Sequence, residues 1–223
     1  NKEATLALRR DSLDHVQAVQ VPVNHPDEIS TLFDPAIVYA KGSRLLRMLQ
    51  HHIGHDAFQQ GLRQYFKEYA YGNTEANDLW NALSNSSGKN VSQFMEAWIK
   101  KPGYPVLHVQ QSSDNTVTLS LEQFFVGNHR DSTTQWQIPL NASSTSVLDT
   151  LTERATRITV QPDETIRMNI NSVSHYVTHY DPVLLSRIVA KINDTSCTPL
   201  DRVQLLSEQM LLARSGVTST SSL

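Results

Sequence analysis

Histidine is the residue type in this sequence best suited to binding a metal, and nine histidines are present. His51 and His55 are four residues apart, the spacing at which two side chains on one helix can bind zinc. His51 is followed by His52 rather than by a glutamate that could act as a base, and Gly54 is expected to end the helix between them. We therefore interpret this cluster as a helix terminus, where histidine suits the negative end of the helix dipole.

A second histidine pair and the single cysteine define no clearer site. His175 and His179 are also four residues apart, but the residues between them have a strand pattern, so we do not expect a pair of helical ligands. Cys197 precedes a predicted helix start, a position that can activate a thiol, but no catalytic partner is identifiable. The sequence contains no H-E-x-x-H, G-x-S-x-G, P-loop or dinucleotide glycine pattern. Spacing alone therefore identifies no active site.

The composition excludes several classes of function. The 223 residues include 19 basic and 22 acidic side chains, a formal net charge of −3. No basic stripe interleaved with aromatic residues is present, so nucleic acid is not an expected partner. No apolar run approaches the roughly 20 residues of a membrane helix, so we expect no membrane segment in this chain. The only cysteine, Cys197, cannot form an internal disulfide, which is compatible with a reducing compartment such as the cytoplasm.

Residues 34–101 have the pattern of a packed helical region. Asp34 can cap a helix N-terminus, with Pro35 in the first helical position. Apolar residues at helical spacing predict four helices in turn, over about residues 34–53, 56–70, 76–83 and 94–99. Pro102 ends the last of them. The first 30 residues, which two prolines interrupt, are expected to be irregular.

The periodicity changes at Pro102-Gly103-Tyr104-Pro105. Short runs bounded by turn residues follow, over residues 106–110, 116–121, 136–140, 157–160, 166–170 and 176–178. Several short strands at this spacing predict a small β-sandwich.

Helical patterns return near the end of the sequence. Asp181-Pro182 and Thr198-Pro199 each combine a capping residue with a proline at the first helical position. The order of helices, strands and helices predicts a multidomain α and β protein rather than an alternating α/β sheet, with parts over residues 1–103, 104–180 and 181–223. Because the sequence starts at Asn1 without a signal peptide and stops soon after a helical pattern, we expect it to be cut from a longer protein.

Residues 33–49, FDPAIVYAKGSRLLRML, resemble the Y-x-K-G segment of the aminopeptidase N family of zinc aminopeptidases, which are gluzincins. Further stretches resemble the same family in the same order, over residues 54–83, 94–107, 167–181 and 201–216. The resemblance implies that residues 1–103 are the C-terminal helical part of a thermolysin-like catalytic domain. It also implies that residues 104–180 are a β-sandwich domain and that residues 181–223 begin a C-terminal α-helical domain.

The resemblance implies a catalytic role for Tyr39. In the family, the tyrosine of Y-x-K-G donates its hydroxyl to the oxyanion of the tetrahedral intermediate, while zinc polarises the scissile carbonyl. Taken alone, Tyr39 would be a packed aromatic near a helix start. Lys41 and Gly42 complete the motif, and we expect them to be structural. Lys41 should be exposed or paired, and Gly42 should allow close helix packing.

The family's zinc ligands and its G-x-M-x-N substrate loop precede Y-x-K-G and have no counterpart in this sequence. The resemblance therefore implies zinc in the full-length parent and none bound by this chain, which should be inactive alone on the parent's peptide substrates. It also implies contacts with an upstream catalytic half and a downstream helical domain of the same protein. A non-catalytic relative that acts as a binding or scaffold module is the alternative. An unrelated adhesion or carbohydrate-binding sandwich would leave the ordered matches unexplained.

Overall fold

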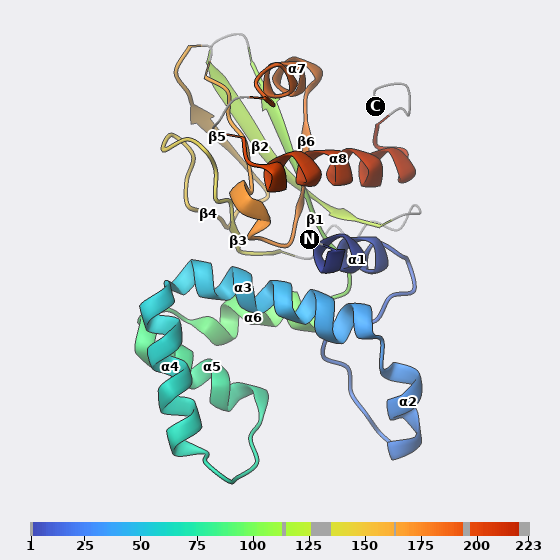
Figure 1. Ribbon diagram of the computed structural model, residues 1–223, viewed down its shortest axis with the longest axis vertical. Helices are drawn as coiled ribbons and strands as arrows, with labels where there is room; N and C mark the ends of the chain where they lie inside the picture. The colour runs from blue at the N-terminus through green and yellow to red at the C-terminus, as the bar shows by residue number, and fades with distance from the viewer. Residues whose placement is uncertain (1, 113–114, 126–134, 163, 194–196, 219–223) are drawn as a thin grey trace.

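The computed structural model describes residues 2–112, 115–125, 135–162, 164–193 and 197–218. Helices α3 to α6 occupy one end of the molecule, a small sheet with helices α7 and α8 occupies the other, and helix α1 lies between them (Figure 1). The prediction of a protein that combines helices with a small sheet is confirmed.

The N-terminal segment is more ordered than the sequence predicts. Helix α1 covers Lys2–Asp11, so the prediction of an irregular start is wrong there. The two prolines lie beyond this helix, and its buried residues Ala7 and Leu8 give it an apolar side to pack. The short 3-10 helix η1 (Pro26–Glu28) and the single turn α2 (Ile29–Leu32) follow.

The predicted helix over residues 34–53 is present, but its first part is a π-helix. The π-helix η2 covers Ala36–Lys41 and continues directly into α3, Gly42–Ile53. Asp34 caps it as predicted, because its Oδ1 accepts a 3.0 Å hydrogen bond from the amide of Ala36. The remaining predicted helices are confirmed as α4 (His55–Glu68), α5 (Ala76–Ser87) and α6 (Val91–Lys100).

The main sheet has four strands in the order β5-β2-β1-β6. Strand β1 (Tyr104–Gln111) pairs antiparallel with β2 (Thr116–Phe124) and parallel with β6 (Val177–Tyr180), and β5 (Ala155–Thr159) pairs antiparallel with β2. Two further short strands, β3 (Ile138–Pro139) and β4 (Thr150–Leu151), form a separate pair. Most of the predicted strand runs therefore contain strands.

The run over residues 166–170 is the exception, since it forms no strand in the described structure. Two of its amides do donate to carbonyls that directly follow β3, from Asn169 to Leu140 and from Ile170 to Asn141. However, Asn169 has φ 55°, in the left-handed region, which breaks the extended backbone and leads into the 3-10 helix η3 (Ile170–Ser172). The periodicity of the side chains carries no sign of this turn.

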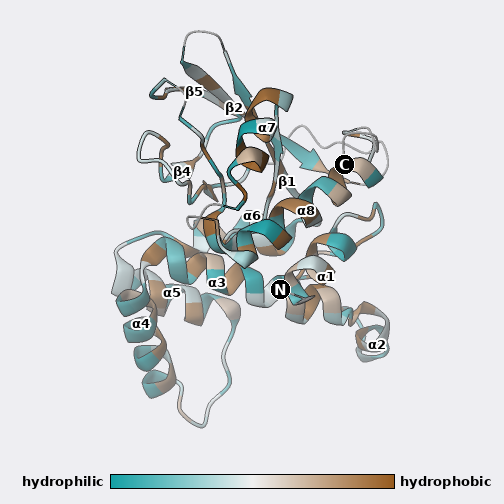
Figure 2. Cartoon of the chain, turned by 45° about the horizontal axis from the view of Figure 1, so that its top comes forward, coloured by the Kyte–Doolittle hydropathy of each residue, from teal (hydrophilic) through white to brown (hydrophobic). Residues whose placement is uncertain are grey.

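Helices α7 (Pro182–Ala190) and α8 (Pro199–Arg214) confirm the two predicted proline starts. Asp181 accepts from the amides of Val183 and Leu184 at 2.9 Å each, and Thr198 forms a capping box with Asp201. Apolar and polar residues alternate along the helices, as Figure 2 shows. Every helix in the described part of the chain falls short of the length and apolar character that a membrane crossing requires.

One hydrophobic core extends from the helices into the sheet. Trp98 of α6 is fully buried and lies in the same cluster as Met48 of α3, Leu107 of β1 and Trp136. Its indole Nε1 donates to the carbonyl of Gln137 across 3.3 Å. The helical end and the sheet therefore stabilise each other through shared apolar burial.

Candidate functional site

Tyr39 lies in the π-helix η2 with 65% of its surface exposed. Its ring meets Phe33 edge to face, with 5.6 Å between the ring centroids and 77° between the ring planes. No residue in the described part of the chain forms a hydrogen bond with the Tyr39 hydroxyl. Single-turn π-helices are frequent at functional sites, and this one presents an unpaired phenol to solvent.

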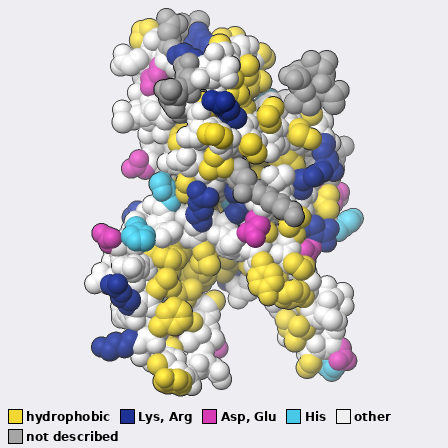
Figure 3. Space-filling view, in the orientation of Figure 1, with side chains coloured by type: hydrophobic (Ala, Val, Ile, Leu, Met, Phe, Trp, Pro, Cys, Tyr) yellow, Lys and Arg dark blue, Asp and Glu magenta, His cyan; other side chains and the backbone are white. Residues whose placement is uncertain are grey.

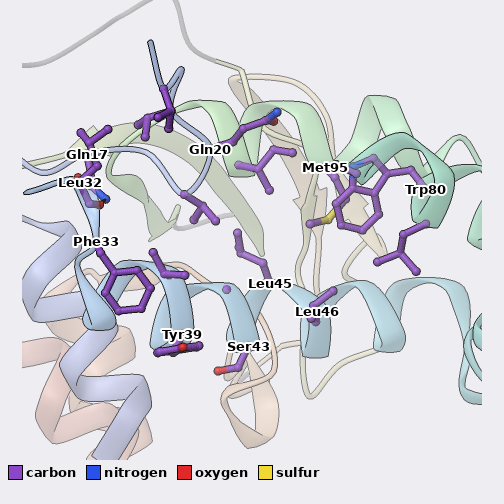
Figure 4. A pocket seen from close by; sticks show the side chains of 18 of the residues that line it. Gln17, Gln20, Leu32, Phe33, Tyr39, Ser43, Leu45, Leu46, Trp80 and Met95 are labelled. Carbon is purple, nitrogen blue, oxygen red and sulfur yellow. Dashed lines mark hydrogen bonds between the residues drawn. The ribbon is translucent and has the colours of Figure 1, made fainter. Parts of the chain in front are cut away.

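A depression of about 670 Å³ lies beside Tyr39, and we call it the apolar groove. Its walls come from residues 17–46 and 76–99, and include Val21, Phe33, Leu46, Leu79, Trp80 and Met95. Leu45 points into the groove, while Tyr39 and Ser43 lie at its margin (Figure 4). Figure 3 shows the corresponding hollow between the α4–α5 pair and the α2 segment, with hydrophobic side chains on both sides.

Lys41 holds the other end of η2 inside the protein. Its side chain is fully buried, and Nζ lies 2.9 Å from Oδ2 of Asp11, whose side chain is also fully buried. The ammonium donates further to the carbonyls of Lys101 and Gly103, each across 3.2 Å. Lys41 is thus paired, one of the two expected outcomes, and a buried ammonium with three acceptors has its hydrogen-bonding capacity satisfied.

Gly42 does not have the role expected for it. A Cβ atom added there would lie 3.9 Å from the carbonyl oxygen of Ile37, which is ordinary van der Waals contact. The prediction that Gly42 allows close helix packing is therefore wrong for the described structure. The close approach between helices occurs instead at Gly61 of α4, which lies against α5.

A buried polar cluster links η2 and α3 to the sheet end. Arg44 donates from Nε to Nδ1 of His175 across 3.1 Å and from Nη2 to the carbonyl of Ser174 across 2.7 Å. Nε2 of His175 lies 3.0 Å from Oδ2 of Asp11. Burial lowers the pKa of Arg44 to about 10 and the pKa of His175 to about 4, so at neutral pH the first is charged and the second is neutral.

The histidines that the sequence offers as metal ligands have other partners. His52, near the end of α3, stacks on Phe94 with 4.4 Å between the ring centroids, and mainly burial lowers its pKa to about 4. His55 follows Gly54 and bonds to Gln50 across 3.1 Å. The helix-terminus interpretation of this cluster is confirmed, because α3 ends at Ile53.

The second histidine pair, His175 and His179, does not form a single site either. Nδ1 of His179 lies 2.9 Å from Nδ1 of His108 on β1, whereas His175 belongs to the buried cluster with Asp11. Cys197 is buried and unpaired. Within the described residues, no group of three or more histidine, cysteine, aspartate or glutamate side chains could hold a metal ion.

Sequence reasoning did not identify Asp11, Arg44 or His175 as members of the site. The pairs that they form are separated by 30 residues from Asp11 to Lys41, by 131 from Arg44 to His175 and by 164 from Asp11 to His175. No local spacing pattern extends over such distances. The one available signal was the lysine of Y-x-K-G, which needs a partner if it is buried.

Comparison with known proteins identifies a family and several relatives to which this chain is similar. Residues 1–98 match the peptidase family M1 domain. The chain is 45% identical over 223 residues to Aminopeptidase N of Lactococcus lactis subsp. lactis, an alignment that covers 97% of the chain and 26% of that protein. It is 38% identical over 218 residues to Aminopeptidase N of Lactobacillus helveticus, covering 95% of the chain and 25% of the relative.

A third relative carries a different name. Tricorn protease-interacting factor F2 of Thermoplasma volcanium is 38% identical over 211 residues, which cover 94% of the chain and 26% of that protein. The chain thus spans about a quarter of the length of the relatives it matches. These similarities relate the chain to the peptidases of family M1. Residues 1–98 are thus related to the peptidase family M1 domain, and nearly the whole chain is similar to part of aminopeptidase N.

Proposed function

We propose that this chain is part of a zinc-dependent aminopeptidase that removes N-terminal residues from peptides, and that Tyr39 stabilises the oxyanion of the reaction. The observation that carries the proposal is the placement of Tyr39. Its hydroxyl is exposed and unpaired among the described residues, on a π-helix that a buried ion pair holds in place. The names of the relatives support the choice of substrate class.

The chemistry assigned to Tyr39 requires only its O–H group. As the scissile carbonyl becomes tetrahedral, negative charge develops on its oxygen, and a phenol aimed at that oxygen stabilises the transition state more than the substrate. An exposed, unpaired donor has no internal hydrogen bond to break before it acts. Removing one donor of this kind typically costs about 10²–10³ in turnover.

The zinc ion does not fit the described residues of this chain. No group of three potential ligands lies together among them, so no step of the reaction is assigned to a metal held here. In the proposed parent, residues outside this chain hold the zinc. The isolated chain is accordingly expected to bind no zinc stoichiometrically and to have no peptidase activity.

The apolar groove is the proposed contact with the rest of the catalytic domain. Its lining residues all fall between residues 17 and 99, within or next to the segment that matches the M1 domain. Exposed apolar side chains gathered in one groove, here Val23, Ile29, Phe33 and Leu46, are typical of an interaction surface. We assign the groove to the upstream half of the same polypeptide, with residues 1–103 completing the catalytic domain. Residues 104–180 would then form the sandwich domain, and residues 181–223 would begin a downstream helical domain.

A direct comparison tests the proposal. The full-length protein and the isolated chain are assayed on a fluorogenic aminoacyl substrate, and the zinc content of each is measured by mass spectrometry. The proposal predicts activity and about one zinc per molecule only for the full-length protein. An inactive full-length protein without zinc would instead favour a non-catalytic scaffold, and zinc-dependent activity of the isolated chain would contradict the assignment of the metal to other residues.

A further inference from the structure

We propose that Asp11 is a positioning residue that fixes the π-helix η2 and thereby sets the place of the Tyr39 hydroxyl. The inference rests on the function proposed above for Tyr39. Asp11 is the last residue of α1, and it is separated from Tyr39 by 27 intervening positions of sequence. It does not contact the groove, so its effect on the reaction has to pass through η2.

The carboxylate of Asp11 binds donors from three other segments. Lys41, the last residue of η2, approaches both oxygens, at 3.0 Å from Oδ1 and 2.9 Å from Oδ2. The amide of Gly103, in the turn between α6 and β1, donates to Oδ1 across 2.9 Å. His175, just before β6, lies 3.0 Å from Oδ2. A fully buried carboxylate with this many donors has little freedom to move, so it defines the position of Lys41.

Helix α1 also holds the start of η2. Nε of Arg10 donates to Oδ2 of Asp34, and Oδ1 of the same aspartate caps η2 through the amide of Ala36. Arg10 and Asp11 are consecutive. The end of α1 therefore binds both ends of η2, through Asp34 ahead of its first turn and through Lys41 at its last residue. The Arg10 side chain is 45% exposed, which makes its pair the weaker of the two contacts. Tyr39 lies between these two contacts.

The π-helical geometry explains why η2 needs such support. The amide of Gly42 reaches back to the carbonyl of Ile37, five residues earlier, and π turns of this kind are rare and short. Packing must therefore keep the segment from returning to α-helical geometry, which would turn Tyr39 to a different direction. In enzymes, a misplacement of about 1 Å at the reacting groups can cost on the order of 10²-fold in rate.

A double-mutant cycle in the full-length enzyme tests the inference. The four proteins are wild type, Asp11→Asn, Tyr39→Phe and the double variant, with Asp14→Asn as a matched control because Asp14 is exposed near the same helix end. We expect Asp11→Asn to lower kcat on the order of 10²-fold with little change in KM. In the Tyr39→Phe background the same change should lower kcat less than about twofold, because there is no hydroxyl left to position. Asp14→Asn should leave kcat unchanged.

The outcomes separate the two proposals. If Tyr39→Phe lowers kcat but Asp11→Asn lowers it by the same factor in both backgrounds, the positioning role is overturned and the role of Tyr39 stands. If Tyr39→Phe leaves kcat at the wild-type value, the proposed function itself fails. Should Asp11→Asn fail to fold, Arg10→Gln takes its place in the cycle. It is expected to lower kcat several-fold only when Tyr39 is present, and an equal loss in both backgrounds would overturn the inference.

Discussion

Arg44 and His175 are joined by a buried hydrogen bond of 3.1 Å from the guanidinium Nε to the imidazole Nδ1. Because a guanidinium can only donate, Nδ1 must carry a lone pair. The ring proton is therefore on Nε2, from which it is donated to Asp11 across 3.0 Å. The contact between α3 and the sheet end thus requires a neutral His175, and protonation of Nδ1 would remove the acceptor that Arg44 uses.

Acid should therefore weaken the fold through His175. Burial lowers its pKa to about 4 in the folded chain, whereas an unfolded histidine titrates near about 6.5. Between these values the unfolded chain binds a proton that the folded chain does not, so stability is lost as the pH falls from about 6.5 to about 4. The buried Glu208 acts in the opposite direction. Burial raises its pKa to about 7, so the folded state keeps its proton and stability falls as the pH rises towards 7.

Replacing Glu208 by Gln should reveal how much His175 contributes to the pH dependence of stability. With the opposing group gone, the free energy of unfolding should change more steeply with pH between about 4.5 and 6.5, by up to about 1.4 kcal/mol per pH unit. Urea unfolding of the chain at pH 5, 6 and 7 measures this slope. Glu153→Gln, at an exposed position, is the control. Equal slopes for Glu208→Gln and the control would contradict the burial of Glu208 as a protonated acid.

Lys41→Met should be strongly destabilising. It removes one partner of a fully buried ion pair and leaves the Asp11 carboxylate without its ammonium, a change that typically costs about 3–5 kcal/mol. Lys100→Met is the matched control. Lys100 pairs with Glu96 on the exposed side of α6, so its loss should change the stability only slightly. Chemical denaturation of both variants gives the comparison. Similar stabilities for the two variants would show that the Asp11–Lys41 pair contributes little to the fold.

Gly61→Ala tests the packing of α4 against α5. The added Cβ would lie 2.6 Å from Oγ of Ser86, 2.8 Å from Cδ2 of Leu83 and 3.1 Å from the carbonyl oxygen of Ala82. Alanine gains about 1 kcal/mol of helix propensity, but overpacking costs about 1–3 kcal/mol, so we expect a net loss of about 1 kcal/mol. Thermal unfolding measures it, with Gln60→Ala on the exposed side of α4 as the control. An unchanged or higher melting temperature for Gly61→Ala would mean that the two helices lie farther apart.

Leu46→Asp tests whether another part of the full-length protein covers the apolar groove. Leu46 is 39% exposed in this chain, so an aspartate there should change the stability of the isolated chain only slightly. In the full-length protein, the proposed upstream half would bury that carboxylate, and the melting temperature should fall by several degrees. Leu46→Met, which keeps the apolar side chain, should leave both melting temperatures close to wild type. An equal effect of Leu46→Asp in the two proteins would show that nothing covers the groove.

Local sequence signals predicted most of the elements, and the failures have physical causes. The proline starts of α7 and α8 and the cap at Asp34 depend only on neighbouring residues, so the local sequence predicts them. The prediction of an irregular start fails at α1 because Pro22 and Pro26 interrupt only the residues near them, whereas α1 ends at Asp11. The strand predicted over residues 166–170 failed because one left-handed residue, Asn169, interrupts an otherwise suitable apolar pattern.

The candidate site was predictable only where a motif marks it. The resemblance around Y-x-K-G pointed to Tyr39, and the structure adds its exposure and its unpaired hydroxyl among the described residues. The partner of Lys41 could not be foreseen, because Asp11 has no distinguishing neighbours and meets Lys41 only after the chain has folded. The same holds for Arg44 and His175, which are 131 residues apart in the sequence and meet only in the folded chain.

The role of Tyr39 is tested most directly by the turnover of the full-length protein with Tyr39→Phe on an aminoacyl substrate. The substitution removes one hydroxyl from an exposed ring, so zinc content and melting temperature should equal those of the wild type. We predict that kcat falls by about 10²–10³ with little change in KM, as expected for a donor that acts only in the transition state. Wild-type turnover by a folded, zinc-loaded Tyr39→Phe protein would contradict the assignment of Tyr39 as the oxyanion donor.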